Sequence, residues 1–251
     1  MTNQTEKPRV EFTGDPDFPI WLLGDSPSDS PSAKDQDLTP LDPRHPTRHS
    51  IWTPIQDVIQ RQLYVECGRR MDDSKLYIRN AVRNSYYKLK TPKNRVDKEY
   101  FNNNRTLFEA KQKEAFIELR ELLNRDNKPK PLLILCFGQF VFEFASRTQE
   151  YKQGDEIEVL QPQVWEKKQG IQNLRKAFDK NIEKVELGEV TLIPLLHASA
   201  AVSFQFASQD FSGGGNNYFE YVGEKIASVL ITKVLFANHP DHRLDKLWLP
   251  A

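Results

Sequence analysis

Polar side chains that could carry out acid and base chemistry accompany three apolar stretches of this sequence. Asp25 and Ser26 come after the first, Asn80 lies within the second, and His197 and Ser199 come after the third. A carboxylate and an imidazole can pass protons to and from a substrate, and an amide can both donate and accept hydrogen bonds. Because open α/β sheets bind ligands at the carboxyl ends of their strands, these positions predict one shared site.

Each of these residues also has a structural interpretation. Asp25 could cap the turn after its strand, because a carboxylate accepts hydrogen bonds from nearby backbone N–H groups. A single histidine at a strand end is more often a hydrogen-bonded structural residue than a catalyst. A catalytic role for His197 therefore requires a partner residue from another part of the chain.

Apolar stretches that alternate with helix-like segments predict an α/β fold with a parallel sheet. The stretch Ile20–Leu23 is typical of a strand that is buried on both faces. We expect Gly24 to allow a turn that other residues disfavour, and Ser50 to act as the N-cap of a helix. Further strands are expected at 76–82, 131–138 and 189–196, shorter strands at 10–12 and 157–160, and helices at 50–67, 100–124, 139–146 and 218–236.

Length and composition predict one domain over residues 1–251, with 1–17 as a loosely ordered lead-in. The net charge is zero, so only a local basic patch would attract nucleic acid. No apolar stretch is long enough to span a membrane and none resembles a signal peptide, so a cytoplasmic protein is expected. Cys67 and Cys136 are too few for a four-thiolate metal or iron–sulfur site.

The densest mixture of basic and aromatic residues lies between Arg79 and Arg95 and includes Arg83 and Lys93. Such a mixture suits phosphate contacts combined with stacking of bases on aromatic rings. A solvated loop explains the same composition equally well.

Residues 28–50 form a long stretch rich in Pro, Ser and Asp, of the kind that often acts as a lid or a binding loop. Its His45 and His49 lack the cysteine or acidic partners of a recognised metal site. Trp52 follows this stretch and could belong either to the core or to a ligand pocket.

Five short motifs, in this order, resemble those of the uracil-DNA glycosylase superfamily, and of its families 4 and 5 in particular. The motif Gly24–Ser28 is similar to Gly-Glu-Ala-Pro-Gly, and Ile78–Arg83 is similar to a strand ending in Thr-Asn-Val-Val-Lys. Pro92–Arg95 repeats the spacing Pro-x-Asn-Arg, Leu135–Gly138 matches a strand ending in Leu-Gly, and His197–Ser199 resembles His-Pro-Ser. The resemblance implies a three-layer sandwich around a central, mostly parallel sheet of four or five strands.

The resemblance also implies an activity: flipping uracil or a modified pyrimidine out of DNA and hydrolysing its N-glycosidic bond. Asp25 takes the place of the family's carboxylate, and His197 that of the group that donates to the departing base. Asn80 would read the edge of the base. The resemblance places Gly24 and Ser26 around the base as well, and Trp52, which has no counterpart in the motifs, would form one wall of the pocket.

The remaining assignments concern the DNA backbone and stack. Ser199 would grip a phosphate, and Phe204 or Phe206 would fill the space that the flipped base leaves. Arg83, Lys93 and Arg95 would contact the backbone. We expect a monomer that binds DNA, single- or double-stranded, without a metal or cofactor.

Some positions depart from the family's pattern. Asp25 stands where the families have glutamate, and Ala198 replaces a proline. These substitutions leave a second hypothesis open, a glycosylase fold that binds nucleic acid or a partner without catalysis. A third hypothesis, an unrelated nucleotide-binding α/β enzyme, is disfavoured because the chain has neither a P-loop nor a Gly-x-Gly-x-x-Gly motif.

Overall fold

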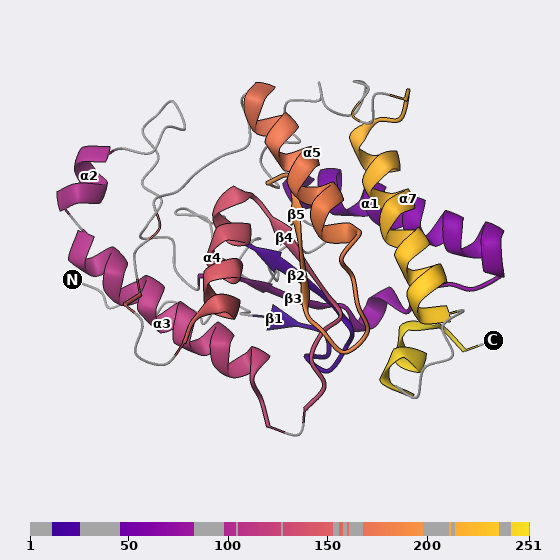
Figure 1. Cartoon of the computed structure of the whole chain (residues 1–251), viewed down its shortest axis with the longest axis horizontal. Helices are drawn as coiled ribbons and strands as arrows, with labels where there is room; N and C mark the ends of the chain where they lie inside the picture. Colours follow the sequence, from indigo (N-terminus) through magenta and orange to yellow (C-terminus); the bar gives the residue numbers. More distant parts are fainter. Residues whose placement is uncertain are drawn as a thin grey trace, which may run out of the picture.

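A mixed, mostly parallel sheet lies at the centre of the computed structural model, with helices on both of its faces (Figure 1). The expected α/β class is therefore confirmed. The structure describes residues 12–25, 46–82, 98–103, 105–126, 128–152, 156–157, 160, 168–197, 211, 214–235 and 242–250.

Within these residues, five strands form the sheet in the order β1-β3-β2-β4-β5. The strands are β1 (Phe12–Thr13), β2 (Ile20–Gly24), β3 (Tyr77–Asn80), β4 (Leu133–Phe137) and β5 (Thr191–Leu195). The four long strands pair in parallel, and only the short β1 runs antiparallel, against β3. β2, β4 and β5 are buried along their whole length, which explains their continuous apolar sequences.

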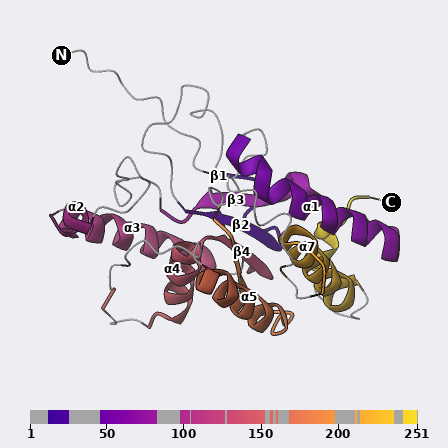
Figure 2. The same cartoon turned by 90° about the horizontal axis from the view of Figure 1, so that it is seen from above.

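Two hydrophobic clusters pack against the two faces of the sheet. One combines residues of α1 (Pro46–Cys67), α5 (Lys168–Ile182) and α7 (Tyr218–Val229), and the other residues of α3 (Arg105–Leu123) and α4 (Gln139–Glu150). Figure 2 shows α1 and α7 on the opposite side of the sheet from α3 and α4. This arrangement is compatible with a three-layer sandwich. The shorter elements are η1 (Asp73–Lys75), α2 (Lys98–Asn103), η3 (Leu230–Leu235) and η4 (His242–Leu247).

Several expected boundaries were wrong. The first helix begins at Pro46, so Ser50 is not its N-cap, because proline is suited to a first helical turn that needs no N–H donor. The expected helix at 100–124 is split between α2 and α3, and the last helix changes to a π-helix at Leu230. Of the expected strand at 157–160, the described residues Ile157 and Leu160 lie outside any strand.

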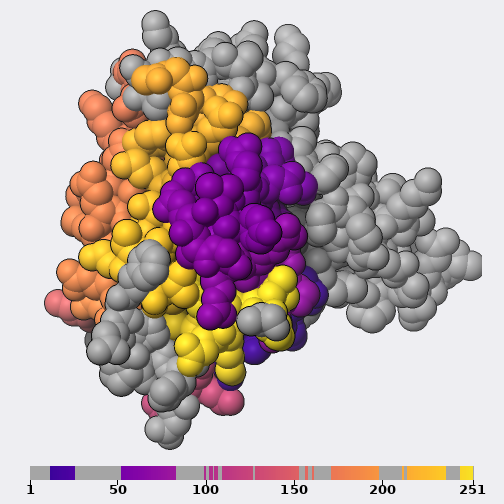
Figure 3. Space-filling model, turned by 90° about the vertical axis from the view of Figure 1, so that its right-hand side faces the viewer, coloured from indigo at the N-terminus to yellow at the C-terminus, as the bar shows by residue number. Residues whose placement is uncertain are grey.

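Close packing of α1 on α7 builds one side of the molecule, on which α1 is flanked by α7 and the C-terminal segment (Figure 3). The helices approach at Gly223, where an added Cβ would lie 2.6 Å from the Cβ of Val58. Glycine is therefore required at this crossing. None of the helices in the described ranges is long and apolar enough to cross a membrane.

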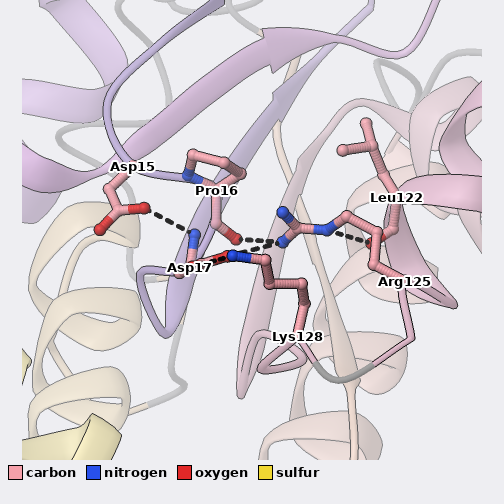
Figure 4. A network of polar contacts seen from close by, with 6 residues as sticks. All are labelled: Asp15, Pro16, Asp17, Leu122, Arg125 and Lys128. Atoms are coloured by element: carbon pink, nitrogen blue, oxygen red, sulfur yellow. Dashed lines mark hydrogen bonds and ion pairs between the residues drawn. The ribbon is translucent and has the colours of Figure 1, made fainter.

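Ionic contacts fix the end of the lead-in to the segment between α3 and β4 (Figure 4). The guanidinium of Arg125 lies 3.1 Å from the carboxylate of Asp17 and donates a hydrogen bond of 2.9 Å to the carbonyl oxygen of Pro16. The ammonium of Lys128 lies 3.6 Å from the same carboxylate. The next residue, Phe18, is fully buried, so these contacts hold the chain at the start of β2.

Gly14 supports a first prediction, which concerns stability. Its φ is +83°, and an added Cβ would lie 1.9 Å from the backbone oxygen of Leu76, so Gly14→Ala must displace one of the two segments. We expect the variant to lose about 3 kcal/mol or more of unfolding free energy, measured by urea denaturation.

Gly68→Ala is the matched control, because Gly68 also has a positive φ, +66°, but nothing within 4 Å of an added Cβ. It isolates the cost of the backbone conformation from the cost of the clash. Equal destabilisation by the two substitutions would contradict the prediction.

Candidate active site

The backbone of Asp25 is fastened to the neighbouring strand. Gly24, at the end of β2, pairs with Asn80 at the end of β3. Beyond this pair, the carbonyl of Gly24 accepts a hydrogen bond of 2.7 Å from Ala81, and that of Asp25 accepts one of 3.0 Å from Val82. The expected turn at Gly24 was wrong, because Gly24 is not among the described glycines with positive φ and continues the strand pairing instead.

His197 follows β5 after one further residue, and the peptide between Leu195 and Leu196 is held on both sides. The carbonyl of Leu195 accepts a hydrogen bond of 2.9 Å from the N–H of Gly138, at the end of β4. The N–H of Leu196 donates a hydrogen bond of 2.9 Å to the hydroxyl of Tyr218, in α7. The main chain therefore approaches His197 from a fixed direction.

The side chains of Asp25 and His197 meet. The Oδ2 atom of Asp25 lies 3.1 Å from the Nε2 atom of His197, which is within hydrogen-bonding distance. The carboxylate is 7% exposed and the imidazole 24% exposed, so the pair is largely shielded but reachable from solvent. The structure thus brings together the two residues that the sequence analysis assigned to catalysis.

This contact bridges two strands that are not neighbours. β4 lies between β2 and β5, so the two outer strands are about 10 Å apart. Leu23 pairs with Cys136, and Cys136 pairs with Pro194, so counting on from these pairs puts Asp25 level with Gly138. The two side chains therefore reach toward each other over the end of β4.

Gly138 leaves the space for this contact. An added Cβ would lie 3.1 Å from Cδ2 and 3.4 Å from Cβ of His197. Its φ of 116° and ψ of 156° fall in a region that is essentially restricted to glycine. Gly138 is a site residue that the motifs alone do not identify, although its place at the end of an apolar strand is a usable signal.

A shielded carboxylate beside an imidazole can hold and transfer a proton. The carboxylate can orient the ring, and the ring can donate a hydrogen bond to a substrate atom or accept one from water. Both groups stand at the carboxyl edge of a mostly parallel sheet, where such folds bind ligands. The arrangement can therefore support a hydrolytic reaction in which negative charge develops on a leaving group.

Two other predicted site residues lie near this pair. The backbone of Asn80 is next to Gly24, and its carbonyl accepts a hydrogen bond of 3.0 Å from Arg79, which also pairs with Glu118 at 3.2 Å. Trp52 is 2% exposed and packs edge-on against Phe137, with ring centroids 6.2 Å apart. Trp52 thus belongs to the core beside the strand that ends at Gly138, and the base-binding roles of both residues stay predictions.

The remaining predicted contacts cannot be placed. They lie outside the described residues: Ser26, Arg83, Lys93, Arg95, Ser199, Phe204 and Phe206.

No cluster of three or more His, Cys, Asp or Glu side chains in the described ranges could hold a metal ion. Cys136 is buried in β4, and burial raises the pKa of its thiol, so the thiolate is disfavoured. A pocket of about 10 Å³ next to Pro19, Leu132 and Gly188 lies at the amino ends of the strands, away from the Asp25–His197 pair.

The functional assignment rests on this geometry and on the sequence motifs. The resemblance to the uracil-DNA glycosylase superfamily stays a prediction. No protein-family model matches the chain, and no curated protein matches it.

Proposed function

We propose that this protein is a DNA glycosylase that hydrolyses the N-glycosidic bond of uracil or a modified pyrimidine and leaves an abasic site. The observation that carries the proposal is the 3.1 Å contact between Asp25 and His197 over Gly138. The order of the sequence motifs supports it, and the proposal includes the finer fold, a sandwich like that of the uracil-DNA glycosylases.

The proposed reaction breaks the bond between C1′ of the sugar and N1 of the base. The electron pair of that bond leaves with the base, and the oxygen of a water molecule forms the new bond to C1′. The carboxylate of Asp25 stabilises the positive charge on the sugar and accepts a proton from the water. That proton finally neutralises the departing base anion.

His197 acts on the other side of the breaking bond. Its Nε2–H would exchange Asp25 for the O2 atom of the base, where negative charge gathers as the bond breaks. The partial exposure of the imidazole supports this exchange, because a base can approach the ring from solvent. Asn80 would hydrogen-bond the edge of the flipped base with its amide.

The test is a glycosylase assay on oligonucleotides that carry uracil, hypoxanthine or a 5-substituted pyrimidine, in single and double strands. Cleavage at abasic sites after mild alkali reports the product. We expect release of a pyrimidine from at least one substrate, and no product from the His197→Ala variant.

An absence of product from every substrate would overturn the proposed activity. If the protein still bound the same oligonucleotides, that result would favour the catalytically silent, DNA-binding hypothesis. Release of base by the His197→Ala variant at the wild-type rate would instead locate the activity elsewhere in the chain.

A further inference from the structure

One peptide group directs the chain into His197. The carbonyl of Leu195 and the N–H of Leu196 belong to the same planar unit. Gly138 holds the carbonyl from the β4 side, and the hydroxyl of Tyr218 holds the N–H from the opposite side, each at 2.9 Å. With both ends held, the plane cannot rotate about the chain axis, and this fixes the position of Leu196, the residue that leads into His197.

Tyr218 is itself rigidly placed. It is 1% exposed, and its ring packs edge-on against those of Phe211 and Phe219, with centroids 5.2 Å and 5.4 Å away. The side chain of Asn217 caps α7 by accepting hydrogen bonds from the N–H groups of Phe219 and Glu220. Burial raises the pKa of the Tyr218 hydroxyl, so it stays neutral at physiological pH and can serve as a constant acceptor.

We propose that Tyr218 is a positioning residue that holds the imidazole of His197 against Asp25 by fixing the peptide between Leu195 and Leu196. The ring places the hydroxyl, and the hydroxyl makes the hydrogen bond. Phenylalanine preserves the packing of the ring, so Tyr218→Phe removes the hydrogen bond alone. The consequence for catalysis rests on the proposed glycosylase function, whereas the consequence for the placement of His197 does not.

The experiment compares Tyr218→Phe with Tyr221→Phe. Tyr221 is a matched control, because it lies one turn further along α7 and its hydroxyl also makes a hydrogen bond, which it donates to Asp179 at 2.6 Å. NMR spectra of the imidazole nitrogens report the environment of His197 directly. The chain has five histidines, so the His197 signals are assigned from their loss in the His197→Gln variant.

We expect Tyr218→Phe to shift the His197 signals and Tyr221→Phe to leave them unchanged. In the glycosylase assay, Tyr218→Phe should lower kcat about tenfold with an unchanged KM, the effect of losing one buried hydrogen bond. Backbone amide exchange gives a second measurement on the wild-type protein, in which the Leu196 amide should be as strongly protected as that of Ile193 in β5.

Unchanged His197 signals in Tyr218→Phe would overturn the proposal, as would equal shifts in both variants, which would indicate a general loosening of α7. Fast exchange of the Leu196 amide would overturn it even if Tyr218→Phe did not fold. If the wild-type protein released no base, the proposed function would fail, while the NMR comparison would still decide the role of Tyr218.

Discussion

Asp25→Asn is expected to lower the rate of base release by about 10²- to 10⁴-fold, the usual contribution of a positioned acid or base. Asparagine has nearly the same shape as aspartate, but it carries no charge to stabilise a cationic sugar and cannot accept a proton from water. Because the carboxylate is 7% exposed, water cannot easily replace it. Single-turnover kinetics on the best oligonucleotide substrate measure the effect.

Two comparisons make this result specific. Asp72 is a second buried aspartate, 6% exposed and paired with Lys75 at 2.9 Å, so Asp72→Asn should leave the rate unchanged. His197→Gln should also be slow, and the double variant should be little slower than the worse single variant, because residues that act as a unit are not additive. A wild-type rate in Asp25→Asn would contradict the assignment of the carboxylate.

Gly138→Ala is expected to have the second largest effect, a loss of roughly 10²-fold in the rate of base release. The new methyl group would lie 3.1 Å from the ring of His197, so the imidazole has to shift, and a shift of this ring disturbs its contact with Asp25. The backbone conformation adds a stability loss of about 1–3 kcal/mol, because φ and ψ at this position are unfavourable for alanine. Assays of activity and of urea denaturation on the same preparation separate the two effects.

Gly188→Ala is the control for backbone strain. Gly188 has a φ of +92° and nothing within 4 Å of an added Cβ, and it lies before the amino end of β5, away from the Asp25–His197 pair. It should lose stability but keep its activity. If Gly138→Ala retained full activity in its folded fraction, the absence of a side chain at this position would not be needed for catalysis.

Sequence patterns located the separate parts of the candidate site. Continuous apolar stretches followed by polar residues placed Asp25 and His197 at strand ends. Their contact could not be predicted, because it depends on the order of β2, β4 and β5 in the sheet and on the absence of a side chain at Gly138. Strand order is set by tertiary packing, and local patterns in a single sequence give little information about it.

Local features could be predicted only in part, and the reasons differ from one feature to the next. Gly24 and Gly138 both end apolar stretches, yet only Gly138 adopts a positive φ, since hydrogen bonds from Ala81 and Val82 hold the chain after Gly24 in an extended path. The helix α5 is not among the expected elements, although Leu174, Phe178 and Ile182 recur at intervals of four residues and are buried. The sequence therefore contains the helical periodicity from which α5 could be predicted.

The outer side of β5 has a consequence for association between chains. In the described sheet β5 pairs only with β4. The backbone N–H of Thr191 and the carbonyl of Leu195 make hydrogen bonds on the β4 side, so the backbone N–H and C=O groups of the alternate residues point away from the sheet. Pro194 has no N–H to offer there, and the N–H of Leu196 is already bonded to Tyr218. A second chain that approached this edge would find two of the donors it needs missing, and edge-to-edge aggregation is disfavoured.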